Sequence, residues 1–345
     1  MKTPEQLIRP NIRALADRRS AVERIDGKDL LRLDTNESPF NSPFNRYPTD
    51  ADELKSAISR HQSIRTDCIF LTNGTHEAVD LLLRLFCVPQ TDNVITLSPT
   101  ADIYADAAML NDVPVRKVCL DTKFGITAEK LLAAADKDTK LIFVCSPNTP
   151  TGNLLDRKEI LKAADSFDGI VVVDEAYMHF ARTAFMLTEL SRHPNIIILR
   201  TFSKAIASAG IRLGMVYAVP RVVRYLDCMT SPFRIGTPTL REAISMTKRL
   251  YDVDKWVRLI LDEREKVMNA FRLLPYCEKV YPSEANFFLV RMEQSEQVYK
   301  YLLSQGIVVS NCGTQEICEG CLRVSIGSTV ENSRLLSALR KYNPE

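Results

Sequence analysis

The chain has 345 residues, of which 46% are hydrophobic and 26% charged, and this composition excludes a disordered, collagen-like or coiled-coil protein. Lys and Arg number 45 against 43 Asp and Glu, and a net charge of +2 argues against a binder of duplex nucleic acid with a strongly basic face. No apolar run approaches the roughly 18 residues of a membrane span, and the first residues lack the apolar core of a secretory signal. We therefore expect a cytoplasmic protein of about two domains.

The first 35 residues are charged and predict an arm that packs with the C-terminal small domain or with a second subunit. Over residues 36–240, short apolar runs without alternation indicate buried strands at 68–72, 94–97, 141–145, 170–174, 196–200 and 214–219. Helical patterns lie between these runs, for example at 76–87 and 157–165. The alternation predicts a large α/β domain whose mostly parallel sheet is covered by helices on both faces.

The pattern changes near residue 240. A long helical stretch at 241–274 is followed by a strand at 286–291, a helix at 295–305, a strand at 322–326 and a last helix at 330–341. This order predicts a smaller α+β domain over residues 241–345.

Nine cysteines are expected to be free thiols in a cytoplasmic protein. Four lie in apolar segments, which predicts small buried side chains, namely Cys68, Cys87, Cys119 and Cys145. Cys318-Glu-Gly-Cys321 has the spacing of a zinc-binding pair, but neither a second pair nor a nearby histidine accompanies it. We therefore expect structural thiols and no metal site.

The most informative segment is 196–215, where an apolar strand runs into Thr201-Phe-Ser203-Lys204 and Arg212 follows. A lysine after a strand is most often a surface cation, but that interpretation does not explain the hydroxyls and the arginine beside it. The pattern favours a lysine that forms a Schiff base, with Thr201, Ser203 and Arg212 around a phosphate.

A second apolar strand ends in Asp174-Glu175-Ala-Tyr177. A carboxylate at the carboxyl end of a parallel strand lies at the crevice where such sheets bind ligands, although a helix N-cap is the alternative for one Asp. A nucleotide-binding interpretation of the same pattern requires a G-x-x-x-x-G-K-[ST] loop, and the sequence contains none.

Two further strand ends carry turns. Asn73-Gly74-Thr75-His76 begins a helix, where backbone N–H groups and the helix dipole favour an anion. There His76 either contacts the anion or faces solvent. The loop 145–153 holds Asn148 at the crevice, unless it is a simple turn of Asn, Pro and Gly. Together the four segments supply the lysine, the acidic partner and the phosphate anchor that a pyridoxal phosphate enzyme needs.

With these residues the chain resembles the fold-type I pyridoxal-phosphate-dependent aminotransferases, and among them the histidinol-phosphate aminotransferase family. The resemblance also rests on Leu33-Asp-Thr-Asn36-Glu37-Ser-Pro, Arg46-Tyr47-Pro48, the segment 282–291 and Gly320-Cys-Leu-Arg323-Val. It implies a homodimer that transfers an amino group between an amino-acid-like, possibly phosphorylated, donor and a 2-oxo acid.

The resemblance also implies a role for each site residue. Lys204 would hold the cofactor and move a proton, and burial near Arg212 would keep its amine neutral. Asp174 would pair with the pyridine nitrogen, and Asn148 and Tyr177 would contact the ring 3-oxygen. The phosphate would lie among Gly74, Thr75, His76, Thr201, Ser203 and Arg212. Tyr47 would reach the phosphate in the neighbouring subunit, and Asn36 and Arg323 would face the substrate.

Several positions depart from the family pattern. Ala101 stands where a ring-stacking tyrosine is usual, Asp17-Arg18 replaces a Pro-Tyr pair, Val309-Ser310 replaces an arginine, and His76 replaces an acidic residue. From these departures we hypothesise that the donor has shifted from histidinol phosphate to another amino acid. A phospho-amino-acid decarboxylase on the same scaffold and a non-catalytic cofactor-binding homologue are the alternative functions.

Overall fold

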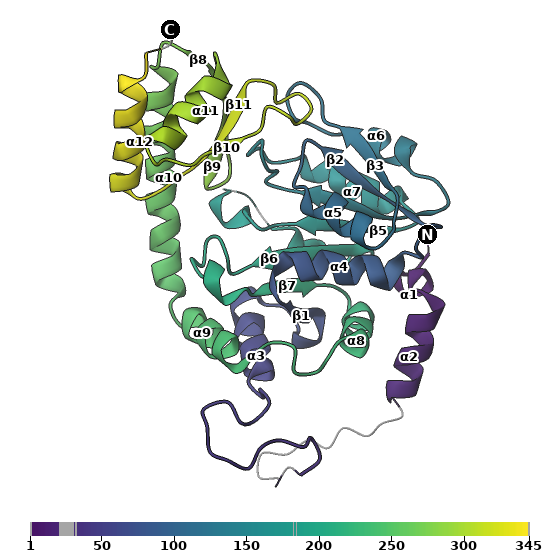
Figure 1. Ribbon diagram of the computed structural model, residues 1–345. Coiled ribbons are helices and arrows are strands. Elements are labelled where there is room, and N and C mark those ends of the chain that lie inside the picture. Colours follow the sequence, from purple (N-terminus) through teal and green to yellow (C-terminus); the bar gives the residue numbers. More distant parts are fainter. Residues whose placement is uncertain (1, 21–30, 32, 182, 184, 344–345) are drawn as a thin grey trace.

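The computed structural model describes residues 2–20, 31, 33–181, 183 and 185–343, and Figure 1 shows a large layered unit, a small unit and an N-terminal arm. The large unit holds a seven-stranded sheet in the order β1-β7-β6-β5-β4-β2-β3, and of these strands β7 alone runs antiparallel to its neighbours. The strands are β1 (Ile69–Thr72), β2 (Asn93–Ser98), β3 (Val115–Cys119), β4 (Thr139–Cys145), β5 (Ile170–Asp174), β6 (Ile196–Thr201) and β7 (Gly214–Tyr217).

Helices cover both faces of this sheet because its central strands are apolar on both sides. One face carries α4 (Gly74–Phe86), α5 (Ile103–Leu110) and α8 (Pro220–Met229). The other carries α3 (Ala51–Gln62), α6 (Ala128–Ala134), α7 (Arg157–Ser166) and α9 (Thr237–Thr247). Short 3₁₀ turns connect the elements, namely η1 (Thr66–Cys68), η2 (Met178–Phe180), η3 (Met186–Glu189) and η4 (Ala209–Ile211). The predicted α/β fold class is confirmed.

The small unit is an antiparallel sheet in the order β10-β11-β9-β8 with three helices packed on it. Its elements are α10 (Leu250–Arg272), β8 (Cys277–Val280), β9 (Phe287–Met292), α11 (Ser295–Ser304), β10 (Ser310–Asn311), β11 (Cys321–Ser325) and α12 (Thr329–Lys341). Helix α10 joins the two units, because Val253 packs in the large apolar core and Val267 in the small one.

The single helix predicted over 241–274 is wrong, because the structure divides this stretch into α9 and α10. The Thr247 hydroxyl donates to the Ile244 carbonyl at 2.7 Å, which replaces part of the helical ladder at the end of α9. Arg249 then takes a non-helical conformation before Leu250, so that α10 leaves in a new direction toward the small unit.

The predicted contact between the arm and the small unit is wrong for residues 2–20. Helices α1 (Pro4–Leu7) and α2 (Pro10–Ser20) lie on the large unit, beside α4 and α8 (Figure 1). Leu7, Ile8 and Ile12 are buried in the same apolar cluster as α4, and the Arg9 N–H donates to the Leu85 carbonyl at 3.1 Å. Apolar burial therefore fixes this part of the arm.

The sequence analysis missed the edge strands β3 and β8 because charged side chains interrupt them. β3 reads Val-Arg-Lys-Val-Cys, and a charged edge of this kind protects a sheet from pairing with another chain. The six parallel strands all end at one edge of the large sheet, and their last residues are Thr72, Ser98, Cys119, Cys145, Asp174 and Thr201. That edge positions the candidate site.

Candidate active site

Asp174, the last residue of β5, lies at the centre of this edge and is only 5% exposed. Its Oδ2 accepts a hydrogen bond from the Tyr104 hydroxyl at 2.9 Å, and its Oδ1 accepts one from the Ala176 N–H at 2.9 Å. Burial raises the pKa of Asp174 to about 6, while these two hydrogen bonds act to lower the same pKa. Two hydrogen bonds thus fix the carboxyl group, while burial disfavours its charged form, so that a cationic ligand beside it would be stabilised.

Tyr104 is a site residue that the sequence analysis did not assign. Its ring lies on α5, is 1% exposed and stacks on Phe143 with a centroid distance of 5.1 Å. The hydroxyl is committed to Asp174, so Tyr104 does not occupy the ring-stacking place that Ala101 leaves open.

Lys204 follows β6 and brings its Nζ to 5.5 Å from the centroid of the Tyr177 ring. Desolvation lowers the pKa of Lys204, repulsion from Arg323 lowers it further, and Arg212 adds a smaller effect. Asp174 opposes these effects by attraction. The expected lowering of this pKa is present, but the Lys204 side chain is exposed where the sequence predicted burial, and Arg323 contributes more to the shift than Arg212 does.

Arg212 lies against the N-terminus of α4, and together with Gly74 it forms a candidate cradle for an anion. Gly74 has a φ of +80°, and a Cβ at this position would lie 2.9 Å from the Arg212 Nη2. Of the described residues, no carboxylate forms an ion pair with this guanidinium. The cradle therefore combines an available cation with the N–H groups of a helix terminus, which is the arrangement a phosphate requires.

The other residues predicted to bind the phosphate are neighbours in sequence of Gly74 or of Lys204. Thr75 and His76 stand in the first turn of α4, with Thr75 half-buried and His76 exposed. The Thr201 Oγ1 accepts a hydrogen bond from the Ser203 N–H at 3.0 Å, which fixes the turn between β6 and Lys204. These residues surround one edge of the sheet, and their contacts with a phosphate stay predictions.

Asn148 does not fit its predicted contact with the ring 3-oxygen. Its side chain is fully buried, and its Nδ2 donates to the Pro99 carbonyl at 3.0 Å and to the Thr151 Oγ1 at 2.8 Å. Its Oδ1 accepts from the Thr100 hydroxyl at 2.8 Å. Both amide protons of Asn148 therefore already donate hydrogen bonds within the protein. Asn148 fixes the turn after β4, as the simpler interpretation of this motif proposed.

The next residue, Thr149, faces the site instead. The Arg323 Nη1 donates to the Thr149 Oγ1 at 2.8 Å, and the side chain of Thr149 also interacts with Tyr177. The Arg323 guanidinium lies 5.4 Å from the centroid of the Phe287 ring, and that ring meets Tyr177 edge-on at 5.0 Å. Residues of the small unit thus complete one side of the site.

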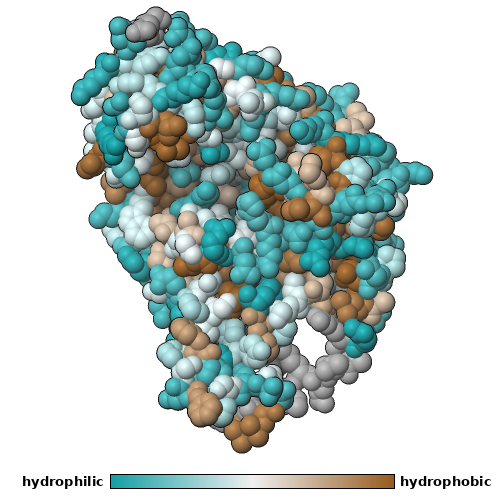
Figure 2. Space-filling model, in the orientation of Figure 1, coloured by the Kyte–Doolittle hydropathy of each residue, from teal (hydrophilic) through white to brown (hydrophobic). Residues whose placement is uncertain are grey.

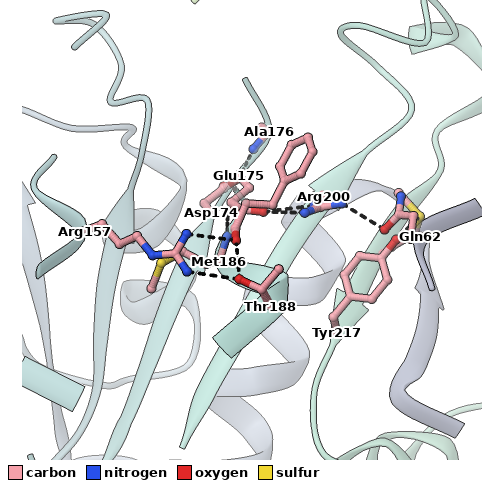
Figure 3. A network of polar contacts seen from close by, with 11 residues as sticks. Gln62, Arg157, Asp174, Glu175, Ala176, Met186, Thr188, Arg200 and Tyr217 are labelled. Carbon is pink, nitrogen blue, oxygen red and sulfur yellow. Dashed lines mark hydrogen bonds and ion pairs between the residues drawn. The ribbon is translucent and has the colours of Figure 1, made fainter. Parts of the chain in front are cut away.

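Glu175 forms a buried ion pair directly behind Asp174 (Figure 3). Its Oε2 accepts from the Arg200 Nε at 3.0 Å and from Nη2 at 2.8 Å, and its Oε1 accepts from the Met186 N–H at 2.6 Å. The Arg200 Nη1 also donates to the Gln62 Oε1 at 2.8 Å. The pair ties the end of β5 to β6 and α3, which holds Asp174 in place.

Two predicted residues, Asn36 and Tyr47, lie on the segment 33–50, which projects from the large unit below α3 (Figure 1). Tyr47 stacks on Phe233 at 4.5 Å and is 48% exposed. Asn36 is exposed with a φ of +54°. Among the described residues, neither contacts the Lys204 site, so both roles stay predictions.

The departures from the family pattern lie in different places. Ser310 pairs with Arg323 across β10 and β11, so this position borders the site. Ala101 is half-buried after β2. Arg18 is exposed on α2, which packs on α8 of the large unit.

Over the described residues, no disulfide joins any of the cysteines. Cys68, Cys87 and Cys145 are buried as predicted, but Cys119 is exposed on the edge strand β3, where its Sγ donates to Glu316 at 2.9 Å. Over the described ranges, no three His, Cys, Asp or Glu side chains gather as metal ligands would. None of the helices in that part of the chain is long and apolar enough to cross a membrane.

Comparison with known proteins extends this picture. A family model described as Aminotransferase class I and II matches residues 35–339. The histidinol-phosphate aminotransferases of Bacteroides fragilis and Bacteroides thetaiotaomicron are each 43% identical over 344 residues. These alignments cover 99% of this chain and 100% and 99% of those relatives.

Solved structures of lower identity share the fold. The crystal structure of the histidinol-phosphate aminotransferase from Clostridium acetobutylicum matches with a TM-score of 0.79 at 22% identity, over 86% of this chain and 90% of that one. The Sinorhizobium meliloti structure, described as a complex with pyridoxal-5'-phosphate, matches with a TM-score of 0.79 at 20% identity, over 96% and 86%.

Proposed function

Because this chain belongs to the aminotransferase class I and II family, whose cofactor is pyridoxal phosphate, we propose that it transfers the amino group of histidinol phosphate to a 2-oxo acid. The meeting of Lys204, Asp174 and Arg212 at one edge of the sheet carries this proposal. Relatives 43% identical over almost the whole chain are named for this donor, and they favour it over the shifted donor of our hypothesis.

The residues present fit pyridoxal phosphate at three points. The cradle of Gly74 and Arg212, with Thr75, His76, Thr201 and Ser203 beside it, suits the phosphate. Asp174 offers a buried carboxylate to the pyridine nitrogen, and Tyr177 with Thr149 stands beside the place for the ring oxygen. When bound, the cofactor acts as an electron sink for the substrate α-carbon.

Lys204 performs the proton transfers in this proposal. Desolvation and the positive charges of Arg323 and Arg212 favour its neutral amine, which is the form that acts as a nucleophile and as a general base. It would take the proton from the α-carbon of the substrate and deliver it to C4′ of the cofactor. Tyr177 borders the path of this amine at 5.5 Å.

Arg323 is the proposed ligand for an anionic group of the substrate. Its guanidinium is oriented by Thr149 and by the ring of Phe287, so little freedom is lost when an anion binds. Both partners of the reaction carry such a group, a phosphate on the donor and carboxylates on the 2-oxo acid. Asn36 is the second predicted substrate residue.

A homodimer and a cytoplasmic location are further parts of the proposal. The segment around Tyr47 exposes the large apolar side chains of Leu31, Leu33, Phe40 and Phe44, and Figure 2 shows apolar surface at its tip. Such a surface suits a second copy of the chain, whose site Tyr47 would then reach. The absence of disulfides among the described residues is in keeping with the reducing cytoplasm.

The test is a single half-reaction. Protein loaded with pyridoxal phosphate receives histidinol phosphate, phosphothreonine, glutamate or an aromatic amino acid, one at a time. We expect histidinol phosphate to convert the cofactor to its amine form fastest, and Lys204→Ala to abolish the conversion. Release of carbon dioxide without this conversion would instead identify the decarboxylase, and conversion by another donor alone would overturn the proposed substrate.

A further inference from the structure

The Tyr104 hydroxyl is the one side-chain donor recorded on the Asp174 carboxylate over the described ranges. The O–H lies 2.9 Å from Oδ2, and the second recorded donor is the backbone N–H of Ala176, on Oδ1. The two residues are 70 positions apart in the sequence and come from different elements, α5 and β5. Each carboxylate oxygen thus has one fixed donor, which sets the rotation of the carboxyl group.

Packing leaves this hydroxyl no alternative position. The Tyr104 ring is 1% exposed and lies parallel to Phe143 of β4, with an interplanar angle of 15°. The Cys145 thiol lies next to the same hydroxyl, directly across the β4–β5 register from Asp174. A donor held this way needs no reorganisation when a ligand binds.

Five titratable groups face Asp174 from the elements around it, and they act in opposite directions. Glu175 raises the pKa of this carboxyl by repulsion and Lys204 lowers it by attraction, while the neutral Tyr104, Tyr177 and Cys145 side chains surround it. Burial is the largest effect and the Tyr104 hydrogen bond is the largest one that opposes it. Loss of that bond would therefore favour the protonated acid, which cannot pair with a protonated pyridine nitrogen.

We propose that Tyr104 is a positioning residue that holds the Asp174 carboxylate ready for the ring nitrogen of the cofactor. The inference rests on the proposed function, because it takes pyridoxal phosphate as the ligand. Tyr104 acts through Asp174 and does not itself touch the substrate. Tyr104→Phe keeps the ring and its stack on Phe143 and removes only the hydroxyl.

The test compares two ligands at equilibrium, pyridoxal phosphate and its deaza analogue, in which carbon replaces the ring nitrogen. For Tyr104→Phe we expect the dissociation constant of pyridoxal phosphate to rise about 10-fold, as for the loss of a hydrogen bond to a charged group. The constant for the deaza analogue should stay unchanged, because Asp174 has no nitrogen to pair with. An equal loss for both ligands, or no loss for either, would overturn the proposal.

Two controls separate this role from a structural one. Tyr276→Phe removes another buried hydroxyl, which donates to the Leu339 carbonyl in the small unit, and it should leave both constants unchanged. In an Asp174→Asn background, Tyr104→Phe should add no further loss for pyridoxal phosphate. An undiminished loss in that background would show that Tyr104 does not act through Asp174.

The pH dependence gives an independent readout. Without the hydroxyl the pKa of Asp174 rises, so the pH below which pyridoxal phosphate binding weakens should move upward from its wild-type position. An unmoved profile would contradict the proposal. If the wild-type protein binds the cofactor but does not react with histidinol phosphate, the proposed donor is wrong. The inference about Tyr104 is not affected by that result.

Discussion

Arg323 of β11 donates a hydrogen bond to the Thr149 Oγ1 at 2.8 Å, across the junction of the small and large units. The two residues are 174 positions apart, and the bond joins the proposed anion ligand to the loop after β4. The same guanidinium lowers the pKa of Lys204 by repulsion, more than Arg212 does. Arg323 therefore lowers the pKa of the lysine amine, and in the proposed function it also binds an anion.

Arg323→Gln tests the second function. Removal of the positive charge should raise the pKa of Lys204, because the protonated amine is no longer repelled. The rate at which pyridoxal phosphate is captured should then reach its plateau at a higher pH than in the wild type, as measured by stopped-flow absorbance. Arg334→Gln, which changes an arginine of α12 outside the site, is the matched control and should leave the profile in place.

Gly74→Ala tests the anion cradle. Position 74 has a φ of +80°, which costs a side-chain-bearing residue about 1–2 kcal/mol, and the new Cβ would lie 2.9 Å from the Arg212 Nη2. That strain lowers stability, whereas displacement of the guanidinium weakens binding, and loss of a hydrogen bond to a charged group, about 1.5–3 kcal/mol, should raise the dissociation constant of pyridoxal phosphate about 10-fold or more. Pyridoxal, which lacks the phosphate, should bind with little change. Gly210→Ala is the control because a Cβ there meets no atom within 4 Å, and an equal effect of both variants would contradict the assignment.

The position of a candidate site residue could be predicted from the sequence where a charged residue follows an apolar strand. Lys204 and Asp174 are such cases, because an apolar strand followed by a charged side chain indicates a position at the sheet edge. Asn148 and Thr149 are adjacent in one turn, and the sequence does not say which of them faces the site. Hydrogen bonds to Pro99 and Arg323 decide this, and both are long-range contacts.

The residues that contact Asp174 and Glu175 from behind could not be predicted from the sequence for the same reason. Tyr104 reaches Asp174 only because α5 packs under β4, and Arg200 reaches Glu175 only through the β5–β6 pairing. The arm was mispredicted because Leu7, Ile8 and Ile12 do not show which apolar surface they join. Apolar periodicity gives the elements, whereas their partners follow from tertiary packing.

The Glu175–Arg200 pair predicts an asymmetry in stability. Glu175→Gln leaves the Arg200 charge uncompensated in a buried place, and removal of one partner of such a pair typically costs about 3–5 kcal/mol of unfolding free energy. The double variant Glu175→Leu/Arg200→Leu should cost less than the single one, because no lone charge stays buried. Urea unfolding measures both. Asp67→Asn breaks the exposed pair with Arg65 and should leave the midpoint unchanged, whereas a double variant less stable than the single would contradict the argument.

His179 predicts a loss of stability at acidic pH. Desolvation lowers the pKa of His179 to about 4 from 6.5, and repulsion from Arg200 and His61 acts in the same direction. The unfolded chain therefore binds the extra proton first, so stability is full above pH 6.5 and falls as the pH drops from 6.5 toward 4. At pH 5 the loss should be about 2 kcal/mol.

Urea unfolding at pH 7 and pH 5 checks the His179 prediction. The variant His179→Gln cannot take up the proton, so its stability should change less between the two values than that of the wild type. The exposed His76 serves as the control, and His76→Gln should keep the wild-type pH dependence. An unchanged dependence in His179→Gln would assign the acid sensitivity to other groups.

The proposed homodimer predicts that Tyr47 acts on the site of the partner subunit. Tyr47→Phe keeps the stack on Phe233 and removes the hydroxyl that would contact the phosphate, and Lys204→Ala removes the reacting amine. When the two variants are co-expressed, each mixed dimer holds one site with both wild-type residues. Activity should rise above the sum of the separate variants, toward about a quarter of the wild-type value for random pairing.

Lys204→Ala co-expressed with Arg212→Ala is the control for this experiment, because both residues belong to the cluster formed within one chain. Every site of that mixed dimer lacks one of the two groups, so no activity should return. Recovery with Tyr47→Phe and none with Arg212→Ala would assign Tyr47 to the partner site. Absence of recovery in both mixtures, with dimers present by sedimentation, would restrict Tyr47 to its own chain and remove this residue from the cofactor site.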